Sequence, residues 1–157
     1  MRKKRNYKRV HASDVKYGSV SLGRFVNYIM REGKKQTAQG VVYDTFDIIK
    51  EKMNQDPILV FNKAIENASP MLEVSTRRVG GANYQVPREV RSSRKFQLAL
   101  RWIIDAARAK KGKRMAEKLA EEIMIAARNE GPAIKKKQDL HRMAEANRAF
   151  AHFGRPR

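Results

Sequence analysis

The sequence contains no cysteine, which excludes disulfide bonds, thiolate metal sites and a cysteine nucleophile. Long apolar runs are missing as well, since no stretch approaches the roughly 20 residues that a membrane-spanning helix needs. The N-terminus is basic but lacks the apolar segment of a secretory signal peptide. We therefore expect an intracellular, soluble protein, and a length of 157 residues is most simply one domain with its own core.

Acidic residues are scarce: 16 Asp and Glu stand against 35 Lys and Arg, for a net charge of +19. The basic excess is uneven along the chain. It is concentrated in residues 1–12, 77–114 and 135–157, whereas residues 32–70 are nearly balanced. Such a distribution is typical of a protein that docks one face on phosphates. Nucleic acid is the expected partner, and an anionic membrane surface is the rival.

The residues that catalysis or metal binding would need are not gathered in any recognisable pattern. His141 and His152 are eleven residues apart, which on a helix separates them by about 16 Å in height, so they cannot share a metal ion. Gly80-Gly81 is not followed by the Gly-Lys-Ser/Thr of a nucleotide-binding loop. No serine, histidine and carboxylate suggest a triad. We expect no enzyme activity, no cofactor and no metal.

One β-hairpin is predicted between Leu72 and Val90. β-Branched or aromatic residues occupy Glu73–Thr76 and Tyr84–Val86, and Gly80–Asn83 between them has turn chemistry. Arms of about eight residues would reach about 25 Å. Pro87 cannot donate to a ladder, so we expect no third strand on that side.

The predicted hairpin is rich in arginine and carries only two acids, Glu73 and Glu89. A surface hairpin with solvated arginines is one interpretation, and a ribbon that lies on nucleic acid is the other, which we favour. The arginines in or just beyond it are Arg77, Arg78, Arg88, Arg91 and Arg94.

The remaining chain is predicted to be helical, with apolar residues at helical spacing. The fold class is mainly α: a single-domain helical bundle of about six helices with one protruding β-hairpin. We expect a basic arm over 1–18, a helical domain over 19–153 with the hairpin at about 72–90, and a tail over 154–157. The first expected helix begins at a cap Ser19 or Ser21 and ends at Gly33, and the second runs over about 35–54. The third starts at Asp56-Pro57 and stops at Ser69-Pro70, and the fourth runs from a cap Ser92 or Ser93 to about 110. The fifth runs over about 115–128, and the sixth follows Lys135–Lys137 with Leu140, Met143, Ala144, Asn147 and Ala151 on one side.

Three arginines of the fourth predicted helix, Arg94, Arg101 and Arg108, are seven residues apart. Each step of seven drifts by only about 20°, so they form one stripe, in which Asp105 can pair with Arg101 or Arg108. A solvated helix surface is the alternative to a phosphate-binding stripe. In the fifth helix, Glu117, Glu121 and Glu122 are expected to be solvated partners of Arg114 and Lys118.

Five stretches carry a resemblance to a known family: Gly33-Lys34-Lys35, residues 77–87 (RRVGGANYQVP), 100–103 (LRWI), 133–137 (AIKKK) and 141–152 (HRMAEANRAFAH). Together they resemble the ribosomal protein S-seven family of the small subunit, in its bacterial or organellar form. The sequence departs from that family's pattern at Asp14-Val15, at Ser21, at Gly40 and in the tail 153–157.

The resemblance implies primary binding to the ribosomal RNA (rRNA) of the small-subunit head and nucleation of head assembly. It also implies a place beside the exit-site tRNA and the mRNA path, near ribosomal protein S-eleven, in the small subunit of a cytoplasmic or organellar ribosome. The side chains expected to bind rRNA are Arg2, Lys3, Lys4, Arg5, Lys8, Arg9, Lys34, Lys35, Arg77, Arg78, Arg91, Arg94, Lys95, Arg101, Arg108, Lys110, Lys111, Lys113, Arg114, Lys135, Lys136, Lys137 and Arg142. Those expected near tRNA or mRNA are Gly80, Gly81, Ala82, Asn83, Tyr84 and Arg148.

Other functions would leave different signs. An architectural DNA-binding protein could use an arginine-rich ribbon in the minor groove, but such arms usually come in pairs on an intertwined dimer. A membrane-surface protein would need a helix whose apolar and basic faces both stay unburied, whereas the apolar stripes here are sized to bury one another.

Overall fold

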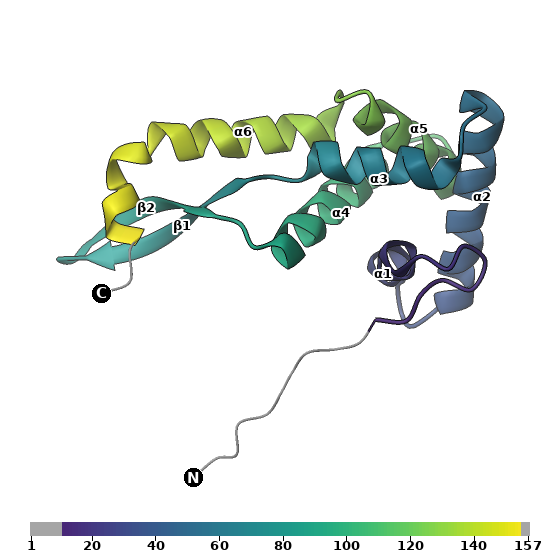
Figure 1. Cartoon of the computed structure of the whole chain (residues 1–157), viewed down its shortest axis with the longest axis horizontal. Helices are drawn as coiled ribbons and strands as arrows, with labels where there is room; N and C mark the ends of the chain where they lie inside the picture. The colour runs from purple at the N-terminus through teal and green to yellow at the C-terminus, as the bar shows by residue number, and fades with distance from the viewer. Residues whose placement is uncertain (1–10, 155–157) are drawn as a thin grey trace, which may run out of the picture. The chain divides into compact units, whose positions relative to one another are not determined.

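The computed structural model describes residues 11–154, and contacts between Cα atoms divide the chain at Val42/Tyr43 into two compact units. Each unit is described by itself. Over the described residues the fold is mainly helical with one two-stranded hairpin, which confirms the predicted class (Figure 1). The predicted division into arm, helical domain and tail uses other boundaries and stays a prediction. The elements in order are α1 Val20–Ile29, α2 Lys35–Met53, α3 Pro57–Ala68, β1 Leu72–Val79, β2 Ala82–Glu89, α4 Ser92–Ala109, α5 Met115–Ala127, α6 Pro132–Ala146 and the 3-10 helix η1 Arg148–Gly154.

The first unit is built around α1. Ser19 caps this helix, because its side chain accepts a hydrogen bond from the Leu22 amide at 3.4 Å. Leu22, Phe25, Val26 and Ile29 of the predicted apolar face are buried, whereas Met30, expected on the same face, is half-buried and lies just beyond the helix. The expected stop at Gly33 lies too late: α1 ends at Ile29, and Gly33, with φ +73°, belongs to the turn that leads into α2.

The chain before α1 is tied to it through Asp14 and Gly23. Asp14 is buried and accepts hydrogen bonds from the amides of Lys16 and Tyr17, both at 3.1 Å, while its own amide donates to Ser19 O at 3.1 Å. A Cβ at position 23 would lie 2.5 Å from the carbonyl oxygen of Ala12. Glycine at position 23 therefore lets residues 12–14 cross α1 closely.

The core of the second unit lies among α3, α4 and α5. Asp56 and Pro57 start α3 as predicted, with the Asp56 side chain accepting from the Ile58 amide at 3.0 Å. The Phe46 and Phe61 rings pack with their centroids 5.7 Å apart. Polar anchors join the helices: Thr45 donates to Ala116 O at 3.3 Å, and Asn67 Nδ2 donates to Ala126 O and Ala127 O at the end of α5, both at 3.0 Å.

The start of α4 corrects one expectation. The helix begins at Ser92 with Arg91 as its N-cap residue, and no side chain caps it. Ser92 and Ser93, which the sequence suggested as caps, are therefore the first and second residues of the helix. Its apolar face is buried as expected, with Ala99, Leu100 and Ile103 fully inaccessible to solvent.

The hairpin has two eight-residue strands, as predicted, and no third strand joins them among the described residues. Val79 pairs with Ala82, so the loop is the two residues Gly80 and Gly81. Both have positive φ, +57° and +89°, the combination that a type I′ turn requires. The turn is therefore tighter than the four-residue stretch expected from sequence.

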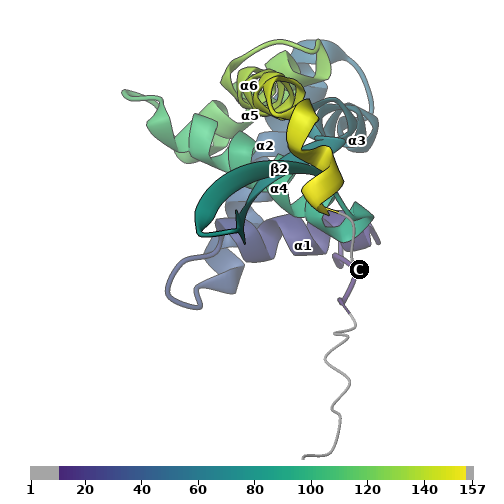
Figure 2. The ribbon, with the colours of Figure 1, turned by 90° about the vertical axis from the view of Figure 1, so that its left-hand side faces the viewer.

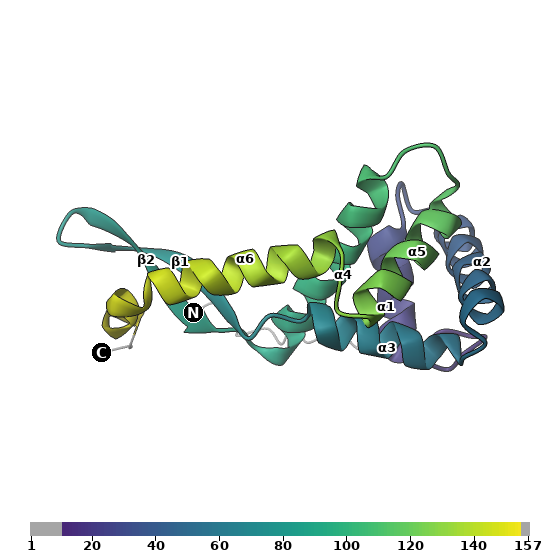
Figure 3. The same ribbon diagram turned by 90° about the horizontal axis from the view of Figure 1, so that it is seen from above.

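The last helix lies along this hairpin. Gly131, with φ +94°, and Pro132 redirect the chain, and α6 then runs beside β1 (Figures 1 and 3). After Ala146 the chain turns as η1 and packs on β2 (Figure 2). The expectation that this helix begins after Lys137 and includes Ala151 was wrong at both ends, since α6 runs from Pro132 to Ala146. Its expected apolar side was correct for Ala144, which is buried, and wrong for Met143, which is 49% exposed.

Candidate nucleic-acid interface

The base of the hairpin is organised by one buried carboxylate, Glu73. Arg88, its cross-strand partner, donates to Glu73 Oε1 from Nε at 2.9 Å and from Nη2 at 2.6 Å. Arg94, from the first turn of α4, donates to Glu73 Oε2 from Nε at 3.4 Å. The Glu73 side chain is 12% exposed, while those of Arg88 and Arg94 are 60% and 43% exposed. The carboxylate is therefore inside and the two guanidinium groups are at the surface.

The distal half of the hairpin is held by aromatic packing instead. The Tyr84 ring lies 5.2 Å from the Phe150 ring and 5.1 Å from the Phe153 ring, centroid to centroid. Arg77, the cross-strand partner of Tyr84, donates to the carbonyl oxygen of Phe153. This contact set, which we call the aromatic brace (Arg77, Tyr84, Phe150 and Phe153), fastens η1 to the hairpin.

The brace bears on two predicted site residues. Tyr84 was expected near tRNA or mRNA, and its ring is half-buried against the two phenylalanines. Arg77 was expected at the rRNA, but its guanidinium is already engaged with η1. Nothing in the sequence pattern linked β2 to residues 150–153, since they are distant in the chain. The functional roles of both residues stay predictions.

The arginine stripe of α4 is present. Arg94, Arg101 and Arg108 are all exposed, on the side of the helix opposite to its buried apolar residues. Arg94 also forms an ion pair with Glu73, so part of its charge is balanced within the protein. The Arg101 side chain forms no hydrogen bond or ion pair with any residue that the structure describes.

The loop between α4 and α5 is more restrained than the sequence suggested. Lys110 Nζ lies 3.1 Å from Glu122 Oε2, in an ion pair that lacks the direction of a hydrogen bond, and Glu122 is fully buried. Lys113 pairs with Glu121, whose hydrogen bond raises the pKa of Lys113. The expectation that Glu121 and Glu122 are solvated partners of Arg114 and Lys118 was therefore wrong.

This pairing divides the predicted rRNA contacts of the loop. Removing one partner from a buried ion pair typically costs about 3–5 kcal/mol, so Lys110 is committed to Glu122. Lys111 and Arg114 are exposed, and neither pairs with any described residue. The signal for Glu122 was in the sequence, because it lies three residues after Leu119 and four before Ala126 on the apolar face.

The predicted contacts in α6 also separate into two groups. Lys137 donates to Asn67 O at 2.7 Å, and burial lowers its pKa. Lys135 and Lys136 are exposed, and their side chains have no partner among the described residues. Arg142 pairs with Asp139, and Arg148 Nη1 lies 4.0 Å from Glu145 Oε1, both within α6 and the turn that follows it.

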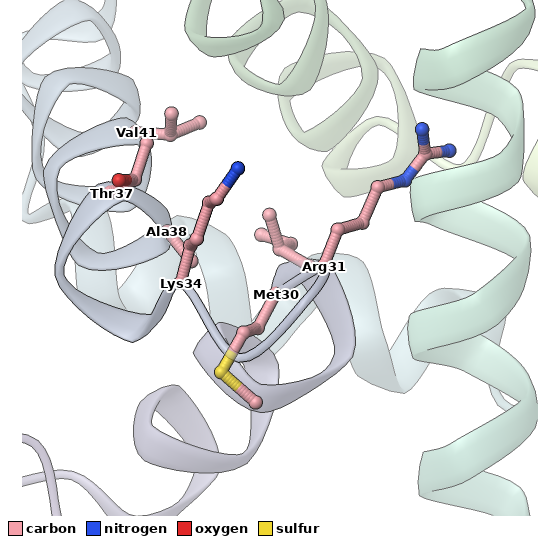
Figure 4. A pocket seen from close by; sticks show the side chains of 7 residues that line it. Met30, Arg31, Lys34, Thr37, Ala38 and Val41 are labelled. Carbon is pink, nitrogen blue, oxygen red and sulfur yellow. The ribbon is translucent and has the colours of Figure 1, made fainter.

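The first unit contributes a smaller site at the turn between α1 and α2. Lys34 pairs with Glu32 at 2.9 Å, with both side chains well exposed, and Lys35 is exposed. A shallow pocket of about 170 Å³ lies here, and Figure 4 shows its lining residues from the turn and from α2. The predicted contacts Arg2, Lys3, Lys4, Arg5, Lys8 and Arg9 lie outside the described residues.

Residues that would indicate catalysis are not assembled in the described part of the chain. No group of three or more histidine, aspartate or glutamate side chains there could hold a metal ion. None of the helices between residues 11 and 154 has the length and apolarity to cross a bilayer. Polyanion binding by exposed cations is the chemistry that this surface can carry out.

Comparison with known proteins gives a consistent answer. The model of the family described as ribosomal protein S7p/S5e matches residues 1–148. The small ribosomal subunit protein uS7 of Thermotoga neapolitana is 60% identical over 153 residues, which cover 98% of this chain and 99% of that protein. The proteins of the same name from Xanthobacter autotrophicus and Cellvibrio japonicus are 54% and 50% identical over 140 and 146 residues, with 89% and 93% of this chain and 90% and 94% of those proteins covered. The chain belongs to the ribosomal protein S7p/S5e family.

Proposed function

We propose that this protein is a structural component of the small ribosomal subunit, in the cytoplasmic ribosome, and that it acts without catalysis. In this role it binds small-subunit rRNA as a primary binder and nucleates assembly of the subunit head. Membership of the S7p/S5e family and the names of the relatives support the assignment to the small subunit. The net charge of +19 supports RNA as the ligand.

The observation that carries the rRNA proposal is a set of exposed cations without intramolecular partners in the described part of the second unit. They lie on the hairpin, on α4 and in the loop that follows α4, whereas neighbouring cations such as Lys110 and Lys137 are engaged within the protein. Such side chains can neutralise phosphates and fix the register of a folded RNA without reading its bases. Within residues 72–114, the cations with exposed and unpartnered side chains are Arg78, Arg91, Arg101, Lys111 and Arg114.

We further propose that the hairpin tip and the C-terminal region border the exit-site tRNA and the mRNA path, with ribosomal protein S-eleven nearby. The aromatic brace supports this role, because it fixes the distal half of a two-stranded ribbon that would be marginally stable alone. The tip residues Gly80 to Asn83 are then presented on a supported arm, exposed to a ligand.

Filter binding to a head-domain fragment of small-subunit rRNA tests the proposal, with duplex DNA of equal length as the competitor. If six to ten phosphates are neutralised, affinity falls by about 10³–10⁵ between about 50 and 200 mM salt. A nearly flat dependence on salt would contradict the phosphate mechanism. A preference for DNA, with a dimer in solution, would favour the architectural DNA-binding alternative.

A further inference from the structure

A pocket of about 430 Å³ lies at the base of the hairpin, and all of its lining residues are charged: Glu73, Arg88, Glu89, Arg91 and Arg94. We propose that this pocket binds a phosphodiester group of the RNA, and that Glu73 is the positioning residue which sets its arginines in place. The inference rests on the proposed rRNA function and deepens it. It adds Arg88 to the contacts expected from sequence and gives Glu73 the separate task of positioning the arginines.

Glu73 holds the guanidinium groups of two arginines, one at each carboxylate oxygen. Arg88 meets Glu73 Oε1 through Nε and Nη2, which fixes the plane of its guanidinium and leaves Nη1 directed elsewhere. Arg94 meets the other carboxylate oxygen through Nε, and its Nη1 lies 3.4 Å from Gln97 Oε1. A free arginine loses considerable side-chain entropy when it binds, and this loss is smaller when the guanidinium is already ordered.

Arg91 supplies the charge that Glu73 does not balance. Its side chain is exposed and forms no hydrogen bond or ion pair with a described residue. It also directly precedes α4, an 18-residue helix whose amino end has no side-chain cap. The helix dipole at this end adds to the attraction for a negative group in the pocket.

The two carboxylates of the pocket distinguish positioning from simple charge. Glu73 is 9% exposed and is bonded to both arginines, whereas the Glu89 side chain is exposed and has no hydrogen bond or ion pair with a described residue. By charge alone, removing either one should strengthen RNA binding, since each repels phosphate. If Glu73 orders the arginines, its removal weakens binding despite the gain in positive charge.

The experiment compares Glu73→Gln with Glu89→Gln, the matched control that removes the same charge from the same pocket. Affinity for the head-domain rRNA fragment is measured by filter binding over a salt series, with thermal melting followed by circular dichroism. Glu73→Gln should weaken binding by about fivefold to tenfold, while Glu89→Gln should leave it equal or stronger. A Glu73→Gln variant that is folded and binds as tightly as Glu89→Gln overturns the proposal.

Arg91→Gln keeps the proposal testable if Glu73→Gln does not fold, because the Arg91 side chain makes no hydrogen bond or ion pair with a described residue. It should weaken binding by about tenfold and reduce the slope of log affinity against log salt by about 1, with an unchanged melting temperature. An unchanged affinity and slope would overturn the phosphate site. Absence of rRNA binding by the wild-type chain would overturn the proposed function, and this inference with it. Wild-type binding together with insensitive variants would overturn this inference alone.

Discussion

The two ends of the hairpin are held by different forces. At the base, Glu73 makes hydrogen-bonded ion pairs with Arg88 and Arg94, whose side chains remain 60% and 43% exposed. In the distal half, the rings of Tyr84, Phe150 and Phe153 pack on one another, and Arg77 donates to a backbone carbonyl of η1. One end is fastened by charge and keeps its cations at the surface, and the other is fastened by apolar contact.

This difference separates two tasks on one ribbon. Ion pairs with exposed arginines stabilise a fold only weakly, but they present guanidinium groups in fixed positions where a phosphate can meet them. Aromatic packing stabilises by burying apolar area and does not rely on charge. We therefore expect the base to control RNA affinity and the brace to control the position of the tip.

The largest effect is expected from reversing charge on the α4 stripe next to the hairpin base. Arg101→Glu with Arg108→Glu should lower rRNA affinity by about hundredfold or more, because two attractive groups become repulsive to phosphate. The helical circular dichroism signal should be unchanged, since both side chains lie on the exposed side of α4. The measurement is filter binding beside a thermal melt.

A matched control reverses two exposed lysines in the near-neutral part of the chain, Lys50→Glu with Lys63→Glu. The net charge changes equally, so a comparable loss of affinity would mean that only total charge matters. Unfolding of the arginine variant alone would show that the stripe has a structural role.

Breaking the aromatic brace should give a smaller and different effect. Phe150→Ala with Phe153→Ala removes both partners of Tyr84 and should lower the free energy of local opening of β2 by about 1–3 kcal/mol. Faster hydrogen exchange at the amides of Tyr84 and Val86, which lie at the hydrogen-bonded positions of the ladder, measures it, with Met143→Ala as a control for lost apolar area on α6. Affinity for rRNA should change by less than about threefold. A loss of rRNA affinity as large as that of the Arg101→Glu, Arg108→Glu variant would contradict the proposal that the brace controls the position of the tip and not RNA affinity.

Shortening the tip should have less effect on the protein and be visible mainly in translation. Deleting Arg78, Val79, Ala82 and Asn83 removes two whole cross-strand pairs, so Gly80-Gly81 would connect the partners Arg77 and Tyr84 in the same register. We expect a nearly unchanged melting temperature and normal entry into small subunits, with more frameshifting or weaker exit-site tRNA retention. Arg78→Gln controls for the lost charge. Failed incorporation by the deletion but not by Arg78→Gln would assign the tip to primary rRNA binding.

The smallest effect is a pH dependence that arises at His141. Its Nε2 accepts a hydrogen bond from the Met71 amide at 3.0 Å, and burial together with the charge of Lys137 lowers its pKa. The folded pKa is below the unfolded value of about 6.5, so this stability is fully present above pH 6.5 and is lost as pH falls through the folded pKa. The melting temperature should decrease over that window, and His141→Gln should flatten the decrease. An identical pH profile for the variant would refute this assignment.

The elements that the sequence predicted best have local signals. Asp56-Pro57 marked the start of α3, and the glycine pair marked the turn of the hairpin, because each fixes a backbone conformation within a few residues. The start of α6 was missed because Lys135 and Lys136 belong to the helix but lie on its solvent-facing side. The spacing of apolar residues does not reveal that such charged residues are helical. Ser92 and Ser93 are residues typical of a helix N-cap, yet the helix starts at Ser92 itself.

The candidate site was predictable as a set of charges but not as a set of contacts. The stripe of Arg94, Arg101 and Arg108 follows from spacing alone and is exposed in the structure. Which cations are engaged within the protein depends on residues far along the chain, as for Lys137 with Asn67 or Arg77 with Phe153. Spacing within one helix cannot show such pairs. The opposition of Glu73 and Arg88 required the exact register, which the tight Gly80-Gly81 turn fixes.

Crosslinking in cells tests the central claim most directly, when both the bound nucleic acid is sequenced and the crosslinked peptides are identified. The account predicts small-subunit rRNA of the head, joined through peptides from the hairpin base, α4 and the loop after it, residues 88–114. Crosslinks to DNA, or to rRNA mainly through the near-neutral residues 43–66, would contradict it.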